Sequence, residues 1–168
     1  MIGFGGYFRT WKTRRRFAKT ERDWDRSDRK REIEAECELP PRPLSEDEEK
    51  LLRRLLEQSE AAKSFLPQLR GMKATRSCTC GCPSITLFPE TDGPFGQGNA
   101  EKILSDQTGY TEDGKLVGLM VFQGGGRLFG LEVYSLDGEG GPLEFGLPVP
   151  DSPRDFHAGI QLESTTEK

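Results

Sequence analysis

Histidine is the scarcest functional residue in this chain of 168 residues, which contains only His157. His157 lies in a polar C-terminal stretch, which argues against a Cys–His or Ser–His pair for nucleophilic catalysis. The carboxylates Glu132 and Glu144 have no identifiable partner for general acid–base chemistry. The sequence therefore favours a non-catalytic protein.

Long apolar runs are missing as well, since only 33% of the residues are hydrophobic and 31% are charged. No stretch reaches the length of a transmembrane helix, and the first residues lack the apolar run of a secretory signal. These two absences predict a cytoplasmic location. The low apolar fraction also predicts that part of the chain does not pack into a core.

Paired Cys-x-x-Cys motifs, which mark most zinc sites, are absent. Three of the four cysteines are instead crowded at Cys78, Cys80 and Cys82, and the fourth, Cys37, is distant in sequence. In one extended strand over residues 78–88, the three crowded side chains would point to the same side. The Gly-Cys-Pro sequence within that stretch predicts a bulge.

The cysteine cluster is compatible with three kinds of thiol chemistry. Free cysteine is commonly buried as a small hydrophobic residue, so reduced thiols without any cofactor are the first interpretation. A metal site with zinc as the candidate ion is the second, and it would need a fourth ligand such as Cys37 or His157. Disulfides are the third, and a reducing cytosol disfavours them. Because one extended strand does not easily wrap three thiols around one ion, the spacing favours metal-free thiols.

The N-terminal region differs in composition from the rest of the chain. Residues 1–19 interleave aromatic and basic side chains and contain no acidic residue, a composition that favours a disordered terminal tail. The alternative is contact with nucleic acid or a membrane surface, for which these are the only candidate residues. Residues 20–38 carry charges of both signs and predict a solvated helix. The proline-rich stretch Leu39–Pro43 predicts a linker.

The clearest helix is predicted over Leu44–Ser59. Ser45 and Glu48 have the spacing of a capping box, and four leucines form one apolar stripe. A second, shorter helix is expected over Ala61–Leu69, interrupted or started by its proline. Both helices are expected to pack on the sheet described next.

Two strand-like runs, Leu116–Phe122 and Leu128–Tyr134, flank a glycine-rich turn and predict an antiparallel hairpin. Alternation of side chains places Phe129 toward the core and Leu128 on the opposite face. The stretch Pro89–Gly114 is expected to be a long loop. Together with the cysteine strand, these elements predict an α+β fold, with one or two helices packed on a small, mostly antiparallel sheet.

The predicted hairpin is apolar on both faces. Leu116, Met120, Phe122 and Tyr134 share the face opposite to the one expected to meet the helices. One layer of helices covers only one side of a sheet, so this second face is either covered by other parts of the chain or exposed as a partner surface. Another protein or a second copy of the chain is the expected partner.

Three motifs carry a resemblance to known proteins: the leucine helix that begins at Leu44, the Cys-Thr-Cys-Gly-Cys-Pro-Ser-Ile stretch, and the Leu-Phe-Gly-Leu-Glu-Val-Tyr-Ser-Leu-Asp-Gly stretch. On these motifs, residues 44–150 resemble a group of short, uncharacterised bacterial proteins. The resemblance implies no activity, cofactor or functional residue. The predicted organisation is a charged extension with its linker over residues 1–43, an α+β domain over 44–153 and a polar tail over 154–168.

The sequence thus favours a small protein that binds or regulates a partner without catalysing a reaction. The alternative is a metal-binding or redox-sensing module built on Cys78, Cys80 and Cys82. That alternative needs deprotonated thiols, and Arg76 is the only cation close to them in sequence.

Overall fold

The computed structural model describes residues 27–89, 102–136 and 146–155, and within these ranges seven strands form one sheet in the order β1-β2-β3-β6-β5-β4-β7. Every neighbouring pair is antiparallel. The strands are β1 (Arg42–Pro43), β2 (Lys73–Arg76), β3 (Ile85–Phe88), β4 (Lys102–Tyr110), β5 (Leu116–Gly124), β6 (Arg127–Ser135) and β7 (Arg154–Asp155). The helices are α2 (Asp28–Glu38), α3 (Glu46–Leu56), α4 (Glu60–Lys63) and the 3-10 helix η1 (Leu66–Leu69). The predicted α+β class is confirmed.

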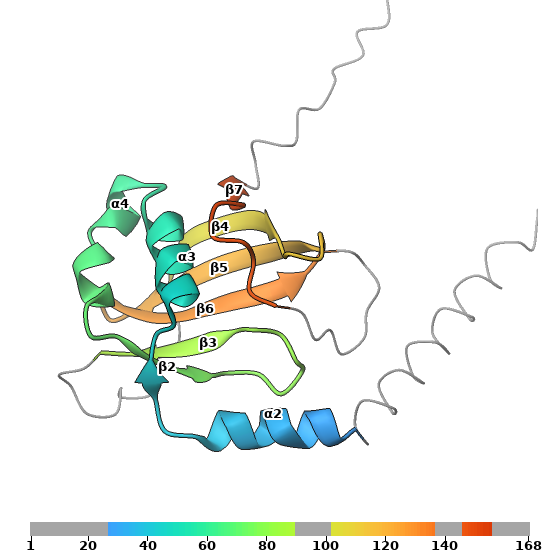
Figure 1. The fold of residues 1–168 in the computed structure, drawn as a ribbon. Coiled ribbons are helices and arrows are strands. Elements are labelled where there is room, and N and C mark those ends of the chain that lie inside the picture. Colours follow the sequence, from blue (N-terminus) through green and yellow to red (C-terminus); the bar gives the residue numbers. More distant parts are fainter. Residues whose placement is uncertain (1–26, 90–101, 137–145, 156–168) are drawn as a thin grey trace, which may run out of the picture.

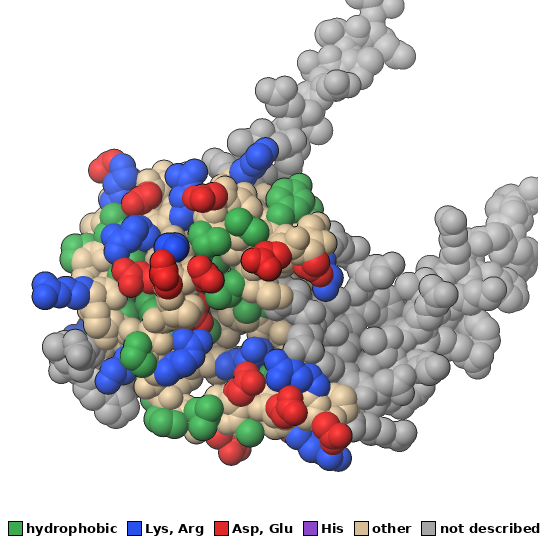
Figure 2. Space-filling view, viewed as in Figure 1, with side chains coloured by type: hydrophobic (Ala, Val, Ile, Leu, Met, Phe, Trp, Pro, Cys, Tyr) green, Lys and Arg blue, Asp and Glu red, His purple; other side chains and the backbone are tan. Residues whose placement is uncertain are grey.

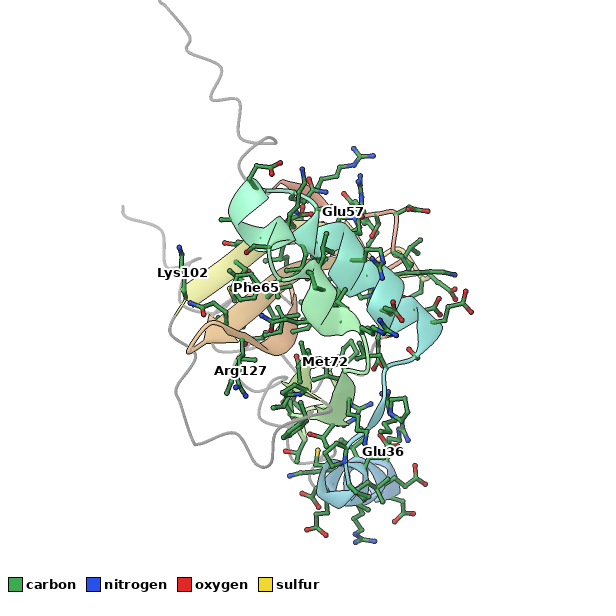
Figure 3. The ribbon with its side chains drawn as sticks, turned by 90° about the vertical axis from the view of Figure 1, so that its left-hand side faces the viewer. Glu36, Glu57, Phe65, Met72, Lys102 and Arg127 are labelled. Atoms are coloured by element: carbon green, nitrogen blue, oxygen red, sulfur yellow. The ribbon has the colours of Figure 1, made fainter. Side chains whose placement is uncertain are left out.

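Helices α3 and α4 lie in front of the sheet, and α2 lies at the end of the sheet formed by β1 and β2 (Figure 1). Turning the molecule by a quarter shows α2 and α4 at opposite ends (Figure 3). None of the helices in the described ranges combines the length and the apolar composition needed to cross a bilayer.

Helix α3 begins and packs as its sequence predicts. The Ser45 hydroxyl accepts a hydrogen bond from the Glu48 amide at 3.2 Å, and the Glu48 carboxylate accepts one from the Ser45 amide at 2.7 Å. This reciprocal capping box satisfies donors that would otherwise lack a partner at the first turn. The apolar stripe is fully buried and consists of Leu51, Leu52, Leu55 and Leu56. Burial of each leucine contributes roughly 1.5–3 kcal/mol to folding.

The opposite side of α3 is covered by charges. Lys50 pairs with Glu46 at 2.6 Å and Arg53 pairs with Glu49 at 2.8 Å, both four residues apart. Figure 2 shows this face of the molecule, where basic and acidic side chains alternate over the helices. Exposed pairs of this kind contribute little to stability, because water screens the attraction between their charges. The apolar stripe therefore holds α3 on the sheet.

The second helical segment is confirmed but divided in two. Ser59 caps α4 by accepting a hydrogen bond from the Ala62 amide at 3.1 Å. The chain then continues into η1, where Pro67 occupies the first turn. Proline is tolerated there because the first amides of a helix have no acceptor within it.

The hairpin of β5 and β6 is confirmed, with a bulge that changes which side chains reach the core. Phe122 pairs with Gly130 and Gln123 pairs with Leu128, so Phe129 is an extra residue in β6. Leu128 is fully buried, whereas Phe129 is only partly buried. The predicted placement of these two residues is therefore wrong, because a bulge inverts the alternation of side chains beyond it.

The predicted long loop over Pro89–Gly114 is wrong in its second half, where Lys102–Tyr110 forms β4 and pairs along β5. Residues 90–101 lie outside the described residues. The core-facing positions of β4 are Ser105, Gln107 and Gly109 rather than apolar residues. A strand whose buried face is polar gives no apolar alternation, so the sequence pattern did not reveal it.

The N-terminal helix and the linker also contact the sheet. The part of the predicted helix that is described is α2, which is capped by Ser27 and buries Ile33 completely. Within the predicted linker, Arg42 and Pro43 form β1 and pair with β2. Residues 1–26 lie outside the described residues, as do residues 156–168 of the predicted polar tail. The first two residues of that tail form β7 against β4.

The hydrophobic core lies between the sheet and the layer of α3 and α4. Its members on the sheet are Ala74, Ile85, Leu87, Val117, Leu119, Val121, Leu128, Leu131 and Val133. In the described part of the chain, no helix covers the opposite face of β5 and β6 (Figures 1 and 3). The sheet therefore has a filled core on one side and an apolar second face on the other.

Candidate thiol site

The cysteine cluster lies in the connection between β2 and β3 rather than in a strand. Arg76 pairs with Ile85 across the two strands, and the Ser77 amide donates to the Ser84 carbonyl at 3.1 Å. The predicted strand is therefore wrong over residues 78–84 and correct from Ile85 onward. Gly81 has a φ of 96°, a left-handed conformation that favours glycine and helps the chain reverse its direction here.

This turn brings the three thiols together. The Sγ atoms of Cys78 and Cys80 are 2.6 Å apart, those of Cys80 and Cys82 are 3.0 Å apart, and all three lie within 4.8 Å of one another. Both distances exceed the about 2.05 Å of a disulfide bond, and the three cysteines are free. Cys82 is buried, Cys80 is exposed, and Cys78 is intermediate. The cluster thus reaches from the core to the surface.

Backbone amides of the same turn point at the sulfur atoms. The Cys80 amide donates to Cys78 Sγ at 3.3 Å, and the Cys82 amide donates to Cys80 Sγ at 3.5 Å. A hydrogen bond to sulfur favours the thiolate over the thiol. Thiolates are the form in which cysteine binds metal ions. The two amides of the loop therefore donate hydrogen bonds that would stabilise thiolates in this turn.

Ser84 anchors the buried end of the cluster to β6. Its hydroxyl accepts from the Val133 amide at 2.9 Å and lies 3.3 Å from the Val133 carbonyl. The same hydroxyl is 3.2 Å from Cys82 Sγ. Ser84 is 4% exposed, so this link is shielded from water. When Cys82 is a thiolate, the hydroxyl can turn and donate to it.

The pKa of Cys80 is raised above its ordinary value, whereas the pKa of Cys82 is lowered. Although Cys80 is exposed as a residue, partial desolvation of its thiol raises the pKa of Cys80 to about 12, with a further contribution from hydrogen bonds to Cys78 and Cys82. Burial also raises the pKa of Cys82, but hydrogen bonds from Ser84 and the neighbouring thiols outweigh it and lower the pKa overall. Cys80 and Cys82 titrate as a pair, and the first negative charge of this pair settles on the buried Cys82.

Helix α2 meets this loop through Arg76. The guanidinium donates to the Cys82 carbonyl at 2.9 Å and forms an ion pair with Glu36 at 3.0 Å. Cys37 follows Glu36 directly, and Arg76, Cys78 and Cys82 all act on its charge. Burial raises the pKa of Cys37, and Arg76 opposes that rise. The tertiary structure thus brings the fourth cysteine into the region of the other three, which the sequence named only as a distant candidate.

A cleft of about 660 Å³ joins the thiols to the second face of the sheet. Its lining includes all three clustered cysteines together with Phe122, Phe129 and Tyr134. Two of the four predicted partner residues, Phe122 and Tyr134, therefore line the cleft. The other two, Leu116 and Met120, are half-buried and do not line it.

The Tyr134 ring covers β5 beside this cleft. A Cβ atom at Gly118 would collide with the Tyr134 ring, so glycine is required for the ring to lie there. Tyr134 and Gly118 are paired across β5 and β6. This part of the second face is thus covered by its own tyrosine, whereas on the thiol side of the cleft Cys80 is exposed.

Two residues of the site were not among the sequence candidates. Ser84 and Glu36 position the cluster through contacts with β6 and with Arg76. Ser84 offered no signal, because serine in a polar loop is common. The helix spacing of Ile33, Glu36 and Cys37 placed these three on one face, but only the docking of α2 shows what that face meets.

No family model, curated protein or solved structure matches this chain. The assignment of a function therefore depends on the geometry of the described residues.

Proposed function

We propose that this protein is a small, non-catalytic regulatory module of the cytoplasm that binds a soft metal ion, with zinc as the first candidate, through Cys78, Cys80 and Cys82. The observation that carries the proposal is the convergence of three Sγ atoms within 4.8 Å in one turn. Thiolate ligands are selective for ions such as Zn²⁺ and Cu⁺. The ion would bias the conformation of the turn and of the elements attached to it.

The turn removes the main objection to a metal site. That objection supposed one extended strand, in which three thiols cannot surround an ion. In the observed turn the sulfurs approach one another from successive positions, and two amides with one hydroxyl are placed to stabilise their charge. A disulfide is a weaker use of the same turn, because bridges between such close cysteines are strained and the cytosol is reducing.

The sulfur positions need a small adjustment to hold an ion. With metal–sulfur distances of about 2.3 Å and tetrahedral angles, sulfur atoms bound to zinc stand about 3.8 Å apart. The Cys78 and Cys80 sulfurs, at 2.6 Å, must therefore separate by roughly 1 Å on binding. Cys80 lies at the surface of the turn, so rotation of its side chain meets little obstruction.

Native mass spectrometry of the reduced full-length protein with added Zn²⁺ tests the proposal. We expect one bound ion per chain, lost when Cys80 is replaced by serine. Thr79→Ser is the matched control, because Thr79 lies between two cysteines, is exposed and supplies no thiol. Absence of stoichiometric zinc and of other soft ions in the wild-type protein would overturn the proposal.

The predicted partner surface at Leu116, Met120, Phe122 and Tyr134 fits this role. The cleft that contains Phe122 and Tyr134 is also lined by the three thiols. A change in the position of the cysteine turn would therefore change the shape of the cleft. This continuity connects ion binding to the surface where we expect another protein to bind.

A further inference from the structure

One face of α2 is turned toward the sheet and the cysteine turn. Ile33, Glu36 and Cys37 have i, i+3 and i+4 spacing, which places them on one side of a helix. Ile33 is fully buried, and Glu36 forms the 3.0 Å ion pair with Arg76 of β2. Because its two neighbours on this face both contact the body of the protein, Cys37 is held on the docked side of α2.

Arg76 fixes α2 relative to the cysteine turn. Its Nε atom forms the ion pair with Glu36, and its Nη1 atom donates to the Cys82 carbonyl. The side chain of Arg76 is 22% exposed, so this bridge is partly shielded from solvent. Cys37 lies one residue from one end of the bridge, and Cys82 forms the other end.

The three clustered thiols supply three donors, whereas zinc in a closed site takes four in a tetrahedron. Among the described residues, the cluster that could hold an ion contains Cys78, Cys80 and Cys82 only. Cys37 is the one remaining cysteine in the whole sequence. A site of four thiolates is the arrangement that structural zinc centres commonly use.

We infer that Cys37 supplies the fourth thiolate to an ion held by Cys78, Cys80 and Cys82, so that ion binding fastens α2 to the cysteine turn. The inference rests on the proposed metal-binding function. Each coordinating thiol releases its proton to solvent and donates a sulfur lone pair to the ion, with no change in oxidation state. Cys37 lies outside the group of three, so the end of α2 moves toward the turn on binding.

Titration with Co²⁺ under reducing conditions tests this coordination, because a tetrahedral cobalt thiolate site absorbs visible and near-ultraviolet light. We expect the wild-type protein to show four thiolate ligands. Cys37→Ser should lose about a quarter of the sulfur-to-cobalt charge-transfer absorbance, since one of four thiolates is removed. It should also bind Zn²⁺ at least about tenfold more weakly. Loss of a residue that only hydrogen-bonds to a metal ligand already weakens metal binding by about that factor, and Cys37 would be a ligand itself.

Ala35→Ser is the matched control, because Ala35 lies in the same helix but is exposed. This variant should bind cobalt with the wild-type spectrum and affinity. Circular dichroism of the metal-free variants shows whether each is folded. A Cys37→Ser protein with the wild-type spectrum and affinity would overturn the inference while the proposed metal site stands. A wild-type protein that binds neither ion would overturn both.

A second measurement uses only the wild-type protein. Alkylation of thiols with iodoacetamide, followed by peptide mass mapping, reports the protection of each cysteine. With zinc bound, Cys37 should be protected together with the three clustered cysteines, and removal of the ion by a chelator should raise the labelling of Cys37 together with that of the exposed Cys80, whereas the buried Cys82 reacts slowly in either state. Protection of the cluster with undiminished labelling of Cys37 would refute the assignment of the fourth ligand, whatever the folding of the variants.

Discussion

Replacement of Glu48 tests how the first turn of α3 is held to the sheet edge. The Glu48 carboxylate is almost completely buried and accepts hydrogen bonds from both Nη atoms of Arg42 and from the Ser45 amide, each at 2.7 Å. Arg42 belongs to β1, and Ser45 is the residue that caps α3. One carboxylate therefore joins the edge strand to the helix.

The expected loss follows from these contacts. An N-terminal capping interaction contributes about 1 kcal/mol, and hydrogen bonds to a charged group contribute roughly 1.5–3 kcal/mol. Arg42 is about half exposed, so solvent screens its part of the interaction and reduces the sum. We expect Glu48→Ala to lower the free energy of unfolding by about 2 kcal/mol and Glu48→Gln by about 1 kcal/mol, because glutamine keeps an acceptor for Ser45.

The pH dependence has a definite sign. Burial raises the pKa of Glu48, but the hydrogen bonds from Arg42 and Ser45 outweigh burial, so the pKa in the folded protein is lowered. The unfolded protein then binds more protons than the folded protein as the pH falls, and stability decreases. The advantage of wild type over Glu48→Gln should be constant above the unfolded pKa of about 4.3 and should shrink as the pH falls through the lower folded value.

Urea unfolding of the wild-type and variant proteins provides the assay. It is measured at several pH values from about 3 to about 7, an interval that contains the ordinary pKa of a glutamate carboxylate. Glu49→Gln is the control, because Glu49 is adjacent but pairs on the surface with Arg53. That variant should lose no more than about 0.5 kcal/mol. Equal, pH-independent losses for the Glu48→Gln and Glu49→Gln variants would show that the buried carboxylate does not hold α3 as argued.

Two further substitutions test the docking of α2 and the second face of the sheet. Ile33→Ala should release α2 from the sheet without unfolding the sheet. Hydrogen exchange of the α2 amides should then accelerate roughly 30-fold, which corresponds to a local loss of about 2 kcal/mol. Unchanged exchange would show that Ile33 does not hold the helix on the sheet. Phe122→Asp should leave the domain folded by circular dichroism and abolish binding of a partner or self-association in native extract and in sedimentation. Glu132→Gln, an exposed change on the same face, is its control, and unfolding of the Phe122→Asp protein would assign this face to the core.

Local patterns were sufficient for the elements whose structure depends on near neighbours. The capping box of Ser45 and Glu48 and the leucine stripe of α3 predicted that helix within a few residues of its observed ends. The glycine-rich turn between two apolar runs predicted the β5–β6 hairpin. In both elements the residues that form the hydrogen bonds or the apolar face are close together in sequence, so a short window contains the relevant interactions.

Local sequence patterns did not predict the features whose conformation depends on pairing with another strand. Strand β4 presents Ser105 and Gln107 to the core, and its pairing with β5 makes it a strand despite that polar face. The bulge at Phe129 also depends on how β5 and β6 align, since the extra residue is defined only by the opposite strand. Neither feature has a signal within its own segment.

The sequence by itself determined that three thiols lie within five residues, that the stretch between them contains a glycine, and that one more cysteine exists. Only the tertiary structure decided how those thiols meet. Pairing of β2 with β3 turns the segment back on itself, and the burial of Ile33 with the Glu36–Arg76 ion pair docks α2, the helix that carries Cys37, on the strand that leads into this turn. The physical reason is that contacts between residues about forty positions apart depend on the packing of whole elements, which no local pattern records.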